Sequence, residues 1–153
     1  MDPSVTARAE LSAVRIRRAE LRGALDGLEL ALAAPASGRA VVWGETVHER
    51  AVRIADDFGA HVEVTEGPGG LHQAILAGDL RLANAVHALT AEHARIAAEV
   101  AALVADSEPP VTEADVEGLR ESGTKLIGRL SRHRQRGADL IYEAYETDIG
   151  GGD

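Results

Sequence analysis

The chain has 153 residues, a formal net charge of −9 and no cysteine, and aromatic residues make up only 3% of it. This length suits one domain with a buried core, and the low aromatic content favours packed helices over a β-sandwich. The acidic charge argues against a nucleic acid or an anionic membrane surface as partner, because both require clustered basic residues. Without cysteine there are no disulfides, thiolate nucleophiles or zinc–thiolate sites.

The apolar residues recur with the three- and four-residue spacing of helix faces, and segments rich in proline and glycine interrupt them. This pattern predicts four long helices and one short helical turn, over residues 4–33, 39–66, 71–76 (the turn), 79 to about 105, and 112 to about 147. Asp79 is expected to cap the third long helix, and Thr112 and Asp115 resemble a capping box before the fourth. Short connections make neighbouring helices antiparallel, so we expect an all-α, up-down-up-down four-helix bundle.

The bundle is expected to form one domain over residues 1–149, followed by a frayed glycine-rich tail over 150–153. The N-terminal segment lacks the apolar core of a signal peptide, and the chain contains no apolar run of about 18 residues. From these features we expect a cytoplasmic protein without a membrane partner. A homodimer is compatible with the pattern.

Three histidines occupy core-facing positions of three different predicted helices, namely His61, His93 and His133. A buried imidazole needs a hydrogen-bond partner or a metal, because an unpaired buried polar group costs about 1–3 kcal/mol. Helical bundles build metal and cofactor sites from inward-facing side chains of this kind. The alternative is that each histidine is an ordinary core residue bonded to a neighbour. The remaining histidines, His48, His72 and His87, fall off these faces and are expected at the surface.

Four segments of the chain, in order, resemble the hemerythrin-like, HHE cation-binding bundles. The first helix contains RIRRAELRGALDGLE (residues 15–29), the second contains HVEVTE (61–66), the third AEH (91–93) and the fourth HRQRGADLIY (133–142). The resemblance covers about residues 11–145. It implies a four-helix bundle that binds non-haem iron, or another divalent metal, and acts in oxygen, peroxide or iron handling. Matched by position, it makes His61, His93 and His133 metal ligands.

The chain departs from the family pattern at three ligand positions. Arg18 stands where the first-helix histidine is expected, and Thr65 and Gly137 replace carboxylates four residues after a histidine. Glu66 lies five residues after His61, about 140° away around the helix, so it reaches the metal only if the helix unwinds at its end. A complete di-iron site is therefore not expected, and Glu66, Asp57 and Glu92 are the candidate carboxylates beside the histidines.

Three functions remain open from the sequence. The first is a hemerythrin-like bundle with a reduced, mononuclear metal site on His61, His93 and His133, with Glu66 as a candidate further ligand. The second is a metal-free bundle that binds a small anionic ligand through Arg18 and the same histidines, with Thr65 and Gly137 leaving room for it. The third is a structural or interaction bundle. The chain contains no Gly-rich phosphate loop and no catalytic triad pattern.

Overall fold

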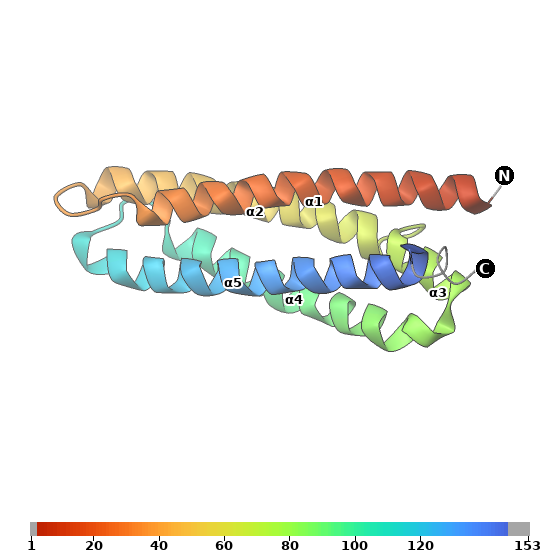
Figure 1. Cartoon of the computed structure of the whole chain (residues 1–153). Coiled ribbons are helices and arrows are strands. Elements are labelled where there is room, and N and C mark those ends of the chain that lie inside the picture. The colour runs from red at the N-terminus through yellow and green to blue at the C-terminus, as the bar shows by residue number, and fades with distance from the viewer. Residues whose placement is uncertain (1–2, 147–153) are drawn as a thin grey trace.

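A computed structural model describes residues 3–146 of the chain, and the side chains of residues 8–145. Four long helices run antiparallel along one another (Figure 1): α1 (Pro3–Ala33), α2 (Ala40–Glu66), α4 (Ala83–Asp106) and α5 (Val116–Ile141). Helix α1 packs against α2 and α5, and α4 packs against the same two helices. The predicted up-down-up-down, all-α four-helix bundle is therefore confirmed.

Short elements close the ends of the bundle. After α2 the chain forms the short helix α3 (Leu71–Gly78), which lies near the start of α1 and the end of α5 (Figure 1). Two 3₁₀ turns, η1 (Leu80–Leu82) and η2 (Glu113–Asp115), precede α4 and α5, and a π-helical turn, η3 (Tyr142–Glu146), follows α5. The predicted end near Thr147 and the tail 150–153 lie outside the described residues.

The predicted helix starts are present, but α4 and α5 each begin one short 3₁₀ turn later than predicted. The Asp79 carboxylate accepts a hydrogen bond from the backbone N–H of Arg81 at 2.9 Å, so Asp79 caps a chain segment as expected. The segment is the 3₁₀ turn η1, however, and α4 begins only at Ala83. At the other loop the Asp115 carboxylate accepts from the backbone N–H of Thr112 at 2.9 Å, as the capping-box prediction required.

The apolar core is divided into two clusters by one polar layer. The larger cluster fills the bundle toward the α1–α2 and α4–α5 loops, and the smaller one lies at the α3 end. On each long helix the residue between the two clusters is polar or charged, and these four residues are Arg18, His61, His93 and His133. The antiparallel packing thus brings the four residues to the same level, which the sequence alone does not fix.

Gly44 in α2 is required by close packing against the loop before α5. A Cβ atom at this position would overlap the Cβ and Cγ2 atoms of Val111, a buried and β-branched side chain. We expect Gly44→Ala to lower the free energy of unfolding by about 1–3 kcal/mol, because overpacking outweighs the gain in helix propensity. Gly23→Ala in α1 is the matched control, since a Cβ there meets nothing within 4 Å. Urea unfolding should show the control to be as stable as wild type or more stable.

Each helix within residues 3–146 is too short or too polar to span a lipid bilayer.

Candidate metal centre

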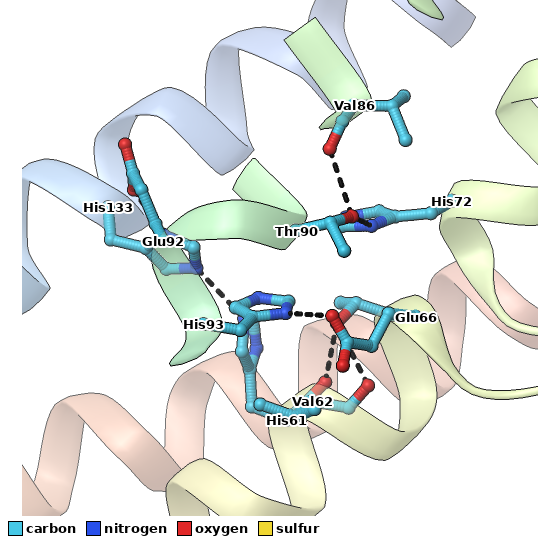
Figure 2. A network of polar contacts seen from close by, with 10 residues as sticks. His61, Val62, Glu66, His72, Val86, Thr90, Glu92, His93 and His133 are labelled. Atoms are coloured by element: carbon cyan, nitrogen blue, oxygen red, sulfur yellow. Dashed lines mark hydrogen bonds and ion pairs between the residues drawn. The ribbon is translucent and has the colours of Figure 1, made fainter. Parts of the chain in front are cut away.

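Three helices bring the three predicted histidines together at the polar layer. His61 from α2, His93 from α4 and His133 from α5 are each at most 6% exposed. Their ring centroids lie 4.9–5.5 Å apart, and each residue offers a ring nitrogen within 4.8 Å of the others. The Nε2 atoms of His61 and His133 are 3.4 Å apart. Figure 2 shows the three rings facing one another between the helices. Among the described residues, this is the group of side chains with metal-ligand spacing.

Two glutamates accept hydrogen bonds from the Nδ1 atoms of two of these rings. The Oε2 atom of Glu66 lies 2.9 Å from Nδ1 of His93, and Oε2 of Glu92 lies 2.6 Å from Nδ1 of His133. Glu92 is itself held by Arg136, whose Nη2 atom is 2.6 Å from Oε1. A carboxylate accepts hydrogen bonds, so Nδ1 of both histidines is protonated and donates. In the neutral rings, the lone pair is therefore on Nε2.

This tautomer directs two basic nitrogens into the bundle. Nε2 of His93 is buried and has no hydrogen-bond partner among the described residues. Nε2 of His133 meets only Nε2 of His61, so the proton in that contact belongs to His61. Metal-binding histidines usually donate their second N–H to a carboxylate or carbonyl, which fixes the ring and raises its basicity. His93 and His133 have this arrangement, whereas Nδ1 of His61 lacks such a partner within the described part of the chain.

The surroundings favour the neutral form of His61 and His133. Burial, together with the nearby His93 and His133, lowers the pKa of His61 to about 3. Burial also lowers the pKa of His133, although the hydrogen bond to Glu92 opposes this. Burial alone would raise the pKa of Glu92, but hydrogen bonds from His133 and Arg136 outweigh it and the net shift is downward. Neutral imidazole is the form that binds metal.

The donor set fits one metal ion better than two. A metal about 2.0–2.1 Å from each nitrogen holds its ligands roughly 3–3.5 Å apart. The His61–His133 pair has this separation, and the third nitrogen lies within 4.8 Å of the other two. A di-iron site also needs carboxylates that project inward to bind the metals. Here the carboxylates of Glu66 and Glu92 instead accept hydrogen bonds from the Nδ1 atoms of His93 and His133. Glu66, the candidate further ligand, is hydrogen-bonded to Nδ1 of His93 in this structure, which is the place of a residue that orients the ring.

The three other site residues suggested by the sequence surround one small cavity beside the histidines. Arg18, Thr65 and Gly137 line a cavity of about 20 Å³, together with His61 and His133. The Thr65 hydroxyl donates to the carbonyl of His61 at 2.8 Å, so it serves the helix backbone and leaves its methyl group beside the site. Arg18 donates through Nη2 to the carbonyl of Arg134 at 3.3 Å. The structure thus brings Arg18, Thr65 and Gly137 to the cavity that His61 and His133 also line.

His72 belongs to the same cluster, which the sequence analysis missed. It was expected at the surface, but it is only 7% exposed and its ring stacks on His93 at 5.8 Å and 8°. Nδ1 of His72 lies 3.0 Å from the Thr90 hydroxyl, which donates to the carbonyl of Val86 (Figure 2). The prediction failed because α3 is too short for a periodic pattern to define its buried face. His87 is exposed as expected, and His48 is half-buried beside Ser107.

Two basic residues of α5 pair with glutamates of the bundle. Arg129 pairs with Glu99 at 2.8 Å and Arg136 with Glu92 at 2.6 Å. Both observed partners lie on α4, which packs beside α5. Asp57, another carboxylate considered for the site, lies 3.7 Å from Arg53 on its own helix.

Buried histidines make the metal-free protein sensitive to acid. The folded-state pKa of His61 is about 3, below the 6.5 of the unfolded chain, and that of His72 is about 4 for the same reason, burial. The folded state therefore binds fewer protons, so the stabilisation is complete above pH 6.5 and is lost as the pH falls toward these values. His61 alone should remove about 2 kcal/mol between pH 7 and pH 5. Urea unfolding in chelator at pH 7 and at pH 5 measures this change in the free energy of unfolding. If His61→Leu lost as much stability between the two pH values as wild type, the prediction would be contradicted.

Comparison with models of known protein families gives no match, and comparisons with curated proteins and with solved structures give none either.

Proposed function

We propose that this chain is a metal-binding four-helix bundle, in which His61, His93 and His133 hold one non-haem metal ion. The observation that carries the proposal is the pair of carboxylate–histidine contacts, Glu66–His93 and Glu92–His133. These contacts fix the tautomer of both rings so that Nε2 lone pairs point at a common centre. Sequence resemblance to the hemerythrin-like bundles favours iron, and a role in oxygen, peroxide or iron handling.

Three imidazoles leave coordination positions open. Three protein ligands plus a free position are the arrangement of catalytic metal sites, whereas structural sites are closed by four. A bound iron would supply redox and oxygen chemistry at this open position. The residues of the chain supply the rest: Glu66 and Glu92 orient the rings, Phe58 packs against all three of them, and the two core clusters exclude bulk water.

A purely structural role explains the histidines less well. A core histidine without metal should have both ring nitrogens satisfied, since an orphaned buried group costs about 1–3 kcal/mol. Nδ1 of His61 and Nε2 of His93 have no partner among the described side chains and backbone. A metal held by the Nε2 atoms would be the missing partner of Nε2 of His93, whereas it would leave Nδ1 of His61 without a partner.

Calorimetric titration of the untagged, chelator-treated protein with Fe(II), Co(II) and Zn(II) tests the proposal. We expect one saturable site per chain, and we expect His87→Ala to bind as wild type because His87 is exposed on α4. Absence of saturable binding for all three metals would refute the proposal, as would stoichiometric binding that survives the loss of all three buried histidines.

A further inference from the structure

The cavity beside the histidines is lined by basic side chains that favour the binding of an anion. It has a volume of about 20 Å³, enough for one or two small atoms without rearrangement. Besides His61 and His133, two arginines line it, Arg18 and Arg134. Both are half-buried, and burial followed by a neighbouring arginine lowers the pKa of each: Arg134 and Arg15 act on Arg18, and Arg22 acts on Arg134, where the carboxylate of Asp26 opposes the shift.

The two guanidinium groups lack full partners. Nε of Arg18 and Nε of Arg134 are buried without a hydrogen-bond partner in the described part of the chain. The hydrogen bond that Arg18 makes goes to a backbone carbonyl, which carries no formal charge. A charged donor left unsatisfied costs more than a neutral one. Nδ1 of His61 on the same cavity wall is also unpartnered.

A surface groove adjoins this cavity at Arg18. The groove, of about 360 Å³ between α1 and α5, shares Arg18 and Ile141 with the cavity, and Arg15 also lines it. The carboxylate of Asp139 faces the same groove and opposes the arginines, while it also accepts from Gln135. In a chain of net charge −9, a groove with two arginines is a local site of positive charge.

From these observations we infer that the cavity admits one end of a small, narrow inorganic anion, which Arg18 and Arg134 recognise and which lies beside the metal centre. The inference rests on the proposed function in one respect, the role of the anion. That role is to be an exogenous ligand of a metal held by His61 and His133. The arginines recognise the anion whether or not metal is bound. Larger anions such as phosphate are excluded by the size of the cavity.

Gly137 offers a test that leaves the fold intact. It lines the cavity on α5, and a Cβ atom built there meets nothing within 4 Å. Gly137→Ala therefore fills part of the cavity without a clash and raises helix propensity. Gly59→Ala is its matched control, because Gly59 is also helical and also has open space at Cβ, but it is exposed on α2, outside the cavity.

The experiment uses azide as the probe at constant ionic strength, with chloride as reference. Binding is followed by thermal stabilisation of the chelator-treated protein and by visible absorption of the Co(II)-loaded protein. We expect saturable binding that weakens at least tenfold in both Arg18→Leu and Gly137→Ala, and is unchanged in Gly59→Ala. Saturable binding in neither form would overturn the inference, and so would binding that neither cavity variant weakens.

The two proposals fail separately. Stoichiometric metal binding without azide binding leaves the metal centre standing and refutes the anion site. Azide stabilisation that depends on Arg18 and Gly137, in a protein that takes up no metal, supports the anion site and refutes the proposed function. Circular dichroism shows whether Arg18→Leu is folded. If Arg18→Leu does not fold, the result for Gly137→Ala decides the test.

Discussion

Replacing His93 by leucine should abolish tight metal binding without harming the fold. Structural zinc sites release about 10–16 kcal/mol through four ligands, so losing one ligand costs about 3–4 kcal/mol, a reduction in affinity of roughly several hundredfold. In chelator the same variant should be at least as stable as wild type. Leucine removes the unpartnered Nε2 atom from the core, and Glu66, at 33% side-chain exposure, can be hydrated once its partner is gone.

The effects of His93→Leu on metal affinity and on stability, taken together, distinguish a metal ligand from a histidine with a purely structural role. A histidine that merely completes a hydrogen-bonded core would destabilise the protein when removed and would leave metal content unchanged. Calorimetric metal titration and urea unfolding in chelator give the two values for His93→Leu, with His87→Leu as the exposed control on the same helix. A variant that binds metal as wild type but unfolds several kcal/mol more easily would contradict the account.

Glu92→Gln should lower metal affinity about 10–100-fold, although Glu92 is not a ligand. Its carboxylate accepts from Nδ1 of His133 at 2.6 Å and is held by Arg136. An amide keeps the shape but loses the charge, and it can present its NH₂ group to the ring. The tautomer of His133 with its proton on Nδ1 and its lone pair on Nε2 is then less favoured. The ring is also a weaker base toward a metal.

The bundle contains a matched control for this substitution. Glu99 on α4 pairs with Arg129 on α5 at 2.8 Å, so it repeats the Glu92–Arg136 pair seven residues away on both helices. Unlike Glu92, Glu99 has no histidine among its hydrogen-bond or ion-pair partners within residues 3–146. Glu99→Gln should change stability by no more than about 1 kcal/mol and leave metal affinity as it is. Equal effects of the two substitutions on metal affinity would show that general electrostatics, and not orientation of His133, is responsible.

The sequence predicted the bundle and the three buried histidines because both follow from helical periodicity. A side chain that recurs with the apolar positions of a long helix faces the core, and His61, His93 and His133 each do so. The shared level of the histidines is a property of the packed bundle. It depends on how far each antiparallel helix extends past its neighbour, and the pattern of one helix says nothing about that.

The orienting residues could not be read from one helix at a time. Glu92 adjoins His93 in the chain but contacts His133 on the next helix, because adjacent residues point about 100° apart. Glu66 likewise turns away from His61, as its five-residue spacing indicated, and meets His93 on α4. His72 lies on α3, whose eight residues are too few to define a face by periodicity. Contacts between helices, and short elements, therefore account for what the sequence did not predict.

Metal content of the untagged protein, purified without chelator and measured by elemental analysis, tests the central claim most directly. The account predicts about one equivalent of a transition metal per chain, with iron favoured, and its loss in His93→Leu. A protein that contains less than a tenth of an equivalent, takes up none when metal is supplied and melts at the same temperature with and without chelator would contradict it.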